Sequence, residues 1–268
     1  MTKKIISIIS GARTGSTYIS DILGNFKNIN NNAELFNPCN MLAWNVQVKY
    51  RKDLDNDYLQ SIKQTTPHII LNSLLEIIEE DILSYKVHDK HLLDSHIEGI
   101  IERSTLVIFL YRNHIDKYIS LQKAQKLNTW QHTDTSFTKI VLNKQDMINH
   151  KNEMKVWYSN TKALVKEKHI VFFEIDYDKF FELSFIDQLE YLKNNIEAAI
   201  NVHLSLNENP KVEFKKQDKT TCYSDKLENY VESKEFIETE ILEYKQSYMN
   251  VLTKTIKDGP HLNLSTSR

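Results

Sequence analysis

The chain has 268 residues, of which 41% are hydrophobic and 26% charged, with only 5 glycines and 4 prolines. This composition excludes collagen-like, linker-like and disordered chains. Because 34 basic side chains stand against 36 acidic ones, the formal charge is -2 and no global field attracts nucleic acid or an anionic membrane, so any anion site must be local.

Strand and helix patterns alternate along the chain. The β-branched run at residues 5–9 predicts a buried strand, and the apolar spacing from Thr17 to Phe26 predicts a helix that Ser16 or Thr17 caps. Further strands are predicted at 84–88, 105–111 and 169–175, and helices near 68–83, from 115, and near 137–167, 186–201 and 225–257. This alternation predicts an α/β protein with a P-loop-like, three-layer fold, in which helices flank a central, mainly parallel sheet.

The whole chain, residues 1–268, is interpreted as one domain with a polar tail from about residue 259. Cys39 and Cys222 lie far apart and neither belongs to a CxxC pair, which argues against a secreted disulfide framework. The apolar run at residues 5–9 is too short for a signal peptide, and no stretch is long enough for a membrane span. We therefore expect a cytoplasmic protein without a transmembrane segment.

The segment SGARTGST, residues 10–17, joins the first strand to the first helix. Its free backbone N–H groups and the helix N-terminus converge on one point, which suits phosphate or sulfate. Gly15 allows close approach of an anion, Ser16 and Thr17 add hydroxyl donors, and Arg13 adds a positive fork. The segment is not a Walker A loop, because Ser16 stands where lysine is required. The alternative is an ordinary capped turn with a surface arginine.

This loop resembles the 5′-phosphosulfate loop of sulfotransferases that use 3′-phosphoadenylyl sulfate (PAPS), especially the bacterial carbohydrate type typified by trehalose sulfotransferase. The resemblance implies a single sulfotransferase-like domain and a sulfuryl transfer from PAPS to a hydroxyl of a sugar or glycolipid, with no metal required. It also implies that the loop residues Arg13, Thr14, Gly15, Ser16 and Thr17 hold the 5′ phosphate and the sulfuryl group.

Two further elements support the resemblance. Arg112 ends a predicted strand and Ser120 follows in the next helix, similar to the family's pair that holds the 3′ phosphate. The carboxyl end of a parallel strand is also where open α/β sheets bind ligands. Lys216, Gln217 and the stretch 223–230 are similar to the late nucleotide-binding turn, although a solvated basic loop is an equal alternative.

The transfer needs a base for the acceptor proton and a cation near the bridging oxygen of the leaving nucleotide. Arg13 is the natural cation. Glu34, in the segment ELFNP, resembles the family's acceptor-side glutamate and is our candidate base; the alternative is an exposed loop carboxylate. His88 and His91 compete for this role, because histidine titrates near neutral pH.

Three neighbouring features complete the expected site. Lys86 resembles the family's strand lysine and would line the acceptor pocket or neutralise sulfuryl charge; the alternative is a lysine that reaches solvent. We expect no zinc site at His88 and His91, because no further ligands cluster near them. Trp130 stands where family members often carry tryptophan, whose face suits a sugar ring, although a lone tryptophan is equally often core.

Two other functions stay open. The first is a nucleotide or small-molecule kinase with an altered P-loop, which predicts magnesium-dependent ATP binding. The second is a non-catalytic module that binds the product nucleotide PAP and does not depend on Glu34. The acceptor is not named by the sequence, and the amphipathic helices suit a homodimer as well as a monomer.

Overall fold

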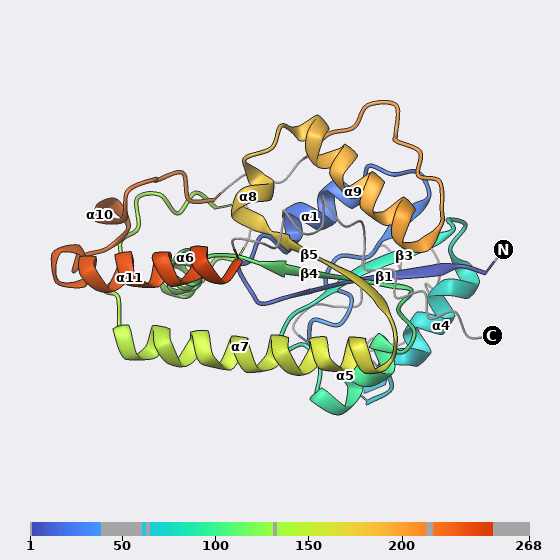
Figure 1. The fold of residues 1–268 in the computed structure, drawn as a ribbon, viewed down its shortest axis with the longest axis horizontal. Coiled ribbons are helices and arrows are strands. Elements are labelled where there is room, and N and C mark those ends of the chain that lie inside the picture. Colours follow the sequence, from blue (N-terminus) through green and yellow to red (C-terminus); the bar gives the residue numbers. More distant parts are fainter. Residues whose placement is uncertain (1, 39–60, 63–64, 131–132, 213–216, 249–268) are drawn as a thin grey trace.

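The computed structural model describes residues 2–38, 61–62, 65–130, 133–212 and 217–248. Five parallel strands form one sheet in the order β2-β3-β1-β4-β5 (Figure 1). Their bounds are Lys4–Ser10 for β1, Ile29–Asn31 for β2, Ile82–Val87 for β3, Leu106–Tyr111 for β4 and Val171–Asp176 for β5. The predicted three-layer α/β fold is confirmed, and the sheet is parallel throughout.

Helices cover both faces of the sheet (Figure 1). One face packs against α4, Pro67–Ile77, α5, Asp94–Ile101, and α7, Lys144–Glu167; the other packs against α1, Ser16–Leu23, α8, Tyr177–Phe181, and α9, Phe185–Ile200. In β1, Ile5 and Ile9 join the first core cluster and Ile6 and Ile8 join the second. Successive side chains of a strand point to opposite faces, so this unbroken isoleucine run requires a helical layer on each side.

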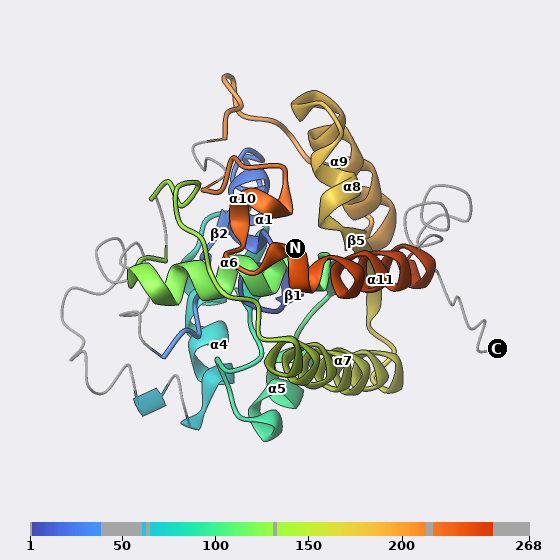
Figure 2. The same ribbon diagram turned by 90° about the vertical axis from the view of Figure 1, so that its left-hand side faces the viewer.

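Three more helices gather at the end of the sheet toward which the strands run. These are α6, His114–Leu127, α10, Tyr223–Lys226, and α11, Tyr230–Tyr248. Figure 2 looks onto this end, where α6 and α11 lie in front of the sheet. Ile115, Ile119 and Ile237 belong to a separate apolar cluster between these two helices.

The strand register aligns the carboxyl ends of the central strands. Ile9 of β1 pairs with Val87 of β3 and with Phe109 of β4. The residues that follow these strands, from Gly11, His88 and Arg112 onward, therefore begin at the same edge of the sheet. This edge is where ligands bind in open parallel α/β sheets.

Several predicted boundaries are corrected. The helix predicted near 68–83 ends at Ile77, because β3 begins at Ile82. The helix predicted near 137–167 begins only at Lys144, and the one predicted near 225–257 is split into α10 and α11. Both breaks have one cause: Leu227 is buried in an extended conformation and pairs with Ile140 in a parallel β-bridge. The sequence patterns did not predict β2, α5 and α8.

Other predictions fall outside the described residues: the end of the last helix beyond residue 248, and the polar tail from about 259. Among the helices that the structure describes, none is long and apolar enough to cross a membrane.

Candidate functional site

A pocket of about 800 Å³ opens at the carboxyl edge of the sheet. Residues that follow every one of the five strands line it: Arg13, Ser16 and Thr17 after β1, Glu34 and Asn37 after β2, His88 and His91 after β3, Arg112 and Ser120 after β4, and Tyr177 after β5. The pocket therefore brings together most of the predicted site residues from separate parts of the chain.

The loop after β1 has the conformation of an anion cradle. Gly15 has φ 92° and occupies the N-cap position of α1, where no side chain forms a capping hydrogen bond. The predicted cap at Ser16 or Thr17 is therefore wrong. A Cβ atom at Gly15 would overlap the ring of Tyr177, so glycine is required here for both its conformation and its size. The Thr14 hydroxyl donates to the Gly11 carbonyl at 2.6 Å and stays inside the loop rather than in the pocket.

The two hydroxyls at the start of α1 are tied to β3 and to the residue that follows it. Ser16 Oγ lies 2.9 Å from His88 Nε2, and Thr17 Oγ1 accepts a hydrogen bond from Lys86 Nζ at 2.5 Å. The ammonium group of Lys86 therefore lies beside a loop that contains no lysine. The strand β3 and the loop after β1 form one side of the pocket together.

Arg13 spans the pocket from the loop to α6. It has φ 63°, a left-handed conformation that is uncommon outside glycine. Its Nε donates to Ser120 Oγ at 3.0 Å, its Nη1 donates to the carbonyl oxygen of Trp130 at 2.7 Å, and its Nη2 donates to Gln217 Oε1. The guanidinium thus lies beside Ser120, on the side of the pocket predicted for the 3′ phosphate.

Arg112 lies against Arg13. Its Nη1 donates to the carbonyl oxygen of Arg13 at 3.0 Å, and its guanidinium carbon lies 5.2 Å from the ring centre of Tyr177. The nearest carboxylate oxygen, Asp178 Oδ1, is 3.7 Å from Arg112 Nε, and this buried Nε has no hydrogen-bond partner among the described residues. Burial, together with the charge of Arg112, lowers the pKa of Arg13 to about 10. Two adjacent guanidinium groups, one of which keeps an N–H without a hydrogen-bond partner among the described residues, are suited to contact an anion.

Tyr177 and Asp178 are site residues that sequence reasoning missed. Both follow β5 directly, so their place after a predicted strand was the signal that could have found them. Asp178 Oδ2 also accepts a hydrogen bond from the backbone N–H of Asn113 at 3.1 Å. Burial raises the pKa of Asp178 against the opposing effect of Arg112.

Glu34 and Lys86 form a buried ion pair. The backbone after β2 continues along β3, because Lys86 N–H donates to the carbonyl oxygen of Ala33 at 2.8 Å. Glu34 Oε1 then lies 3.1 Å from Lys86 Nζ, and Glu34 Oε2 accepts from Asn37 Nδ2 at 2.5 Å. The side chains are 14% and 1% exposed, so neither the exposed-carboxylate nor the solvent-lysine alternative holds.

Burial and the ion pair have opposite effects on the pKa of each member of this pair. Burial acts to raise the pKa of Glu34, but the ammonium of Lys86 and the hydrogen bonds from Asn37 and Lys86 outweigh it and hold that pKa well below its usual range. Burial lowers the pKa of Lys86, and the Glu34 carboxylate opposes this effect. Glu34 is therefore an ionised hydrogen-bond acceptor that faces the pocket.

His88 and His91 lie beside this pair. Their rings stack with centres 4.6 Å apart, and the backbone N–H of His88 donates to His91 Nδ1 at 3.3 Å. Burial, together with His91 and Lys86, lowers the pKa of His88 well below its usual value, which keeps the ring neutral. Ligand-type atoms of Glu34, His88 and His91 all lie within 4.8 Å of one another. The expectation that no further ligand clusters near the two histidines is therefore wrong, since the fold brings in Glu34.

The remaining predicted residues lie at the outer side of the pocket. Trp130 is 49% exposed and lines the pocket, so it is not a core residue. Gln217 is buried beside Arg13, and its Nε2 has no hydrogen-bond partner in the described part of the chain. In the stretch 223–230, Lys226 Nζ pairs with Asp116 of α6 at 2.9 Å. Lys216 and Cys39 lie outside the described residues.

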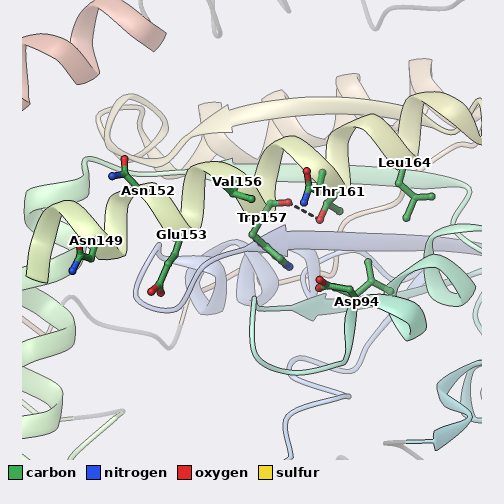
Figure 3. A pocket seen from close by; sticks show the side chains of 10 residues that line it. Asp94, Asn149, Asn152, Glu153, Val156, Trp157, Thr161 and Leu164 are labelled. Carbon is green, nitrogen blue, oxygen red and sulfur yellow. Dashed lines mark hydrogen bonds between the residues drawn. The ribbon is translucent and has the colours of Figure 1, made fainter.

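A second pocket, of about 650 Å³, lies between α5 and α7 (Figure 3). Asp94 and Glu153 line it together with Val156 and Trp157, and none of its described lining residues is an arginine or a lysine. The acidic lining of this second pocket disfavours an anion. In sequence comparisons, no protein-family model matches the chain and no curated protein is significantly similar to it.

Proposed function

We propose that the protein is a PAPS-dependent sulfotransferase that acts on a hydroxyl group of a carbohydrate or glycolipid. The single observation that carries the proposal is the pair Arg13 and Arg112, two adjacent guanidinium groups beside Ser120 Oγ and the N-terminus of α1. Arg112 pairs with Asp178 at 3.7 Å, and its buried Nε still has no hydrogen-bond partner among the described residues. A nucleotide with one phosphate on the 3′ position and another on the 5′ position of its ribose fits such a site.

The two anion positions follow from the elements that supply them. The backbone N–H groups at the start of α1 and the hydroxyls of Ser16 and Thr17 suit the 5′ phosphosulfate. Arg112 and Ser120, on the strand and helix that follow, suit the 3′ phosphate. Arg13 lies between them and donates to Ser120. A nucleotide that carries a 3′ phosphate would compete for this contact, whereas ATP has no group there.

The transfer step needs little from the protein beyond positioning and charge. The acceptor oxygen attacks sulfur, the bond from sulfur to the 5′-phosphate oxygen breaks, and the electron pair of that bond stays on the departing PAP. Glu34 accepts the proton of the acceptor hydroxyl. Arg13 and Lys86 stabilise the charge on the leaving phosphate and on the sulfuryl oxygens.

Lys86 contacts both the anion loop and the candidate base. It donates to Thr17 Oγ1 in the anion loop and pairs with Glu34 at 3.1 Å. When a sulfuryl group occupies the loop, its oxygens compete with Glu34 for the ammonium. Weaker pairing with Lys86 raises the pKa of Glu34, so the carboxylate becomes a stronger base when the cosubstrate is bound. Trp130, half-exposed at the pocket edge, offers a face for a sugar ring.

The kinase alternative gains one argument, because Lys86 supplies the loop with a lysine from another strand. Thermal shift and calorimetry with PAP, ATP and ATP–Mg²⁺ separate the two proposals. We expect PAP to bind most tightly and without magnesium. Binding of ATP–Mg²⁺ with no response to PAP would reject the sulfotransferase proposal. Transfer of labelled sulfuryl from PAPS to mixed glycan and lipid acceptors then distinguishes an enzyme from a PAP-binding module.

A further inference from the structure

We propose that Glu34, His88 and His91 form a binding site for a divalent transition-metal ion of the Zn²⁺ type, and that the bound ion inhibits the protein. One ligand atom from each side chain lies within 4.8 Å of the other two. The three residues follow two neighbouring strands, β2 and β3, and face the same pocket. The site is not visible in the sequence, because Glu34 lies far from the two histidines along the chain.

The donor set has the chemistry of a zinc site with an open position. Two imidazoles and one carboxylate are a known ligand combination for Zn²⁺, with bonds of about 2.0–2.2 Å. Ligand atoms around such an ion lie roughly 3.4 Å apart. Metal binding would draw the three ligand atoms together from separations of up to 4.8 Å. The remaining coordination position would face the pocket of about 800 Å³, where water has access.

Neighbouring groups hold the ligands in place. His88 Nε2 lies 2.9 Å from Ser16 Oγ, and Asn37 Nδ2 donates to Glu34 Oε2 at 2.5 Å. Contacts of this kind orient metal ligands and support their affinity. A metal ion bound through His91 Nε2 would leave the 3.3 Å hydrogen bond from the backbone N–H of His88 to His91 Nδ1 in place. His88 and His91 are only 9% and 7% exposed, which limits competition from solvent.

One neighbour opposes binding. Lys86 Nζ lies 3.1 Å from Glu34 Oε1, and its positive charge repels a metal ion on the same carboxylate. The site should therefore bind Zn²⁺ more weakly than a structural zinc site does. Bound Zn²⁺ should then dissociate readily when the free Zn²⁺ concentration falls. Reversible occupancy suits inhibition, because a metal-bound Glu34 cannot accept a proton. This inhibitory role rests on the proposed function, whereas metal binding itself does not.

Binding is tested on the full-length protein without nucleotide or acceptor. Metal-free protein is titrated with Zn²⁺ by calorimetry and with Co²⁺ by visible absorption, which reports the coordination of cobalt. We expect one site, and we expect His91→Ala to weaken it by about 100-fold or more. His203→Ala is the matched control, because this histidine is exposed and lies on another part of the surface. Lys86→Met should strengthen binding about tenfold, since it removes the repelling charge.

Two results would overturn the site: no Co²⁺ bands and no Zn²⁺ heat up to about 1 mM, or equal affinity in the wild type and His91→Ala. His91→Asn keeps a polar side chain and replaces His91→Ala if that variant does not fold. In the PAPS transfer assay, Zn²⁺ should inhibit the wild type at lower concentration than His91→Ala. If Zn²⁺ binds as expected and no variant transfers sulfuryl groups, the proposed function fails and the metal site stands.

Discussion

The Nη1 nitrogen of Arg112 donates to the carbonyl oxygen of Arg13 at 3.0 Å, so two guanidinium groups lie side by side at the end of the sheet. Burial lowers the pKa of Arg13, and the charge of Arg112 lowers it further because the two cations repel each other. An anion between them would remove this repulsion.

The first prediction concerns Arg112→Ala. We expect PAP binding to weaken about 10–100-fold, because a charge-assisted hydrogen bond contributes roughly 1.5–3 kcal/mol. The variant should also be less stable than the wild type, because it loses the hydrogen bond to the Arg13 carbonyl and leaves the carboxylate of Asp178 without its cation. Calorimetry and thermal unfolding measure the two effects. Arg103→Ala is the control, because Arg103 bonds to Asn72 in another region. Unchanged PAP affinity in Arg112→Ala would reject the assignment of Arg112 to the 3′ phosphate.

The second prediction separates catalysis from stability at Glu34. Glu34→Gln should lower the transfer rate about 10²–10⁴-fold, the usual contribution of a general base. It should also lower the free energy of unfolding by about 3–5 kcal/mol, because it leaves the ammonium of Lys86 buried and unpaired. The double variant Glu34→Gln with Lys86→Met should regain stability and stay inactive. Full activity in Glu34→Gln would transfer the role of base to His88 or His91.

The third prediction compares two glycines. Gly15→Ala should abolish PAP binding and lower the free energy of unfolding by about 1–3 kcal/mol, because alanine is strained at φ 92° and its Cβ meets Tyr177. Gly99→Ala should instead raise stability by roughly 0.5–1 kcal/mol, since Gly99 lies within α5 and has open space around it. Urea unfolding measures both changes. PAP binding by Gly15→Ala at wild-type affinity would show that the loop conformation is not needed.

The fourth prediction concerns Lys117 of α6, which is 2% exposed. Burial lowers its pKa from 10.5 to about 8. Between pH 8 and 10.5 the unfolded chain binds more protons at this residue than the folded chain, so its contribution to the free energy of unfolding rises with pH. Below pH 8 the buried, charged Lys117 lowers the free energy of unfolding by its full amount, which is at most about 3 kcal/mol.

Replacing Lys117 by methionine removes this cost. Lys117→Met should be more stable than the wild type at pH 7, and the difference should shrink as the pH rises toward 10. Urea unfolding of both proteins at several pH values measures it, and other titrating groups cancel in the comparison. A difference that does not change with pH would show that Lys117 is charged in the folded protein across the whole range.

Much of the fold was predictable because local patterns carry it. The runs 5–9 and 105–111 are apolar on both faces, which only a strand between two helical layers accommodates, and both became central strands. Strand β2, Ile29–Asn31, was missed because its short, polar sequence has no such pattern. It forms by pairing with β3, a non-local interaction. The break at Leu227 was missed for the same reason, since its partner Ile140 is distant in the chain.

The sequence by itself determined the α/β class, the loop at residues 10–17 and the placement of Arg112 and Ser120 on one strand–helix unit. Only the tertiary structure decided that Arg13 turns toward Ser120 and that Glu34 meets Lys86 and His88. The physical reason is the strand order, in which β3 and β4 flank β1 and β2 lies beyond β3. Local periodicity specifies which residues form strands, whereas packing of the helical layers specifies which strands become neighbours, and therefore which loops share a pocket.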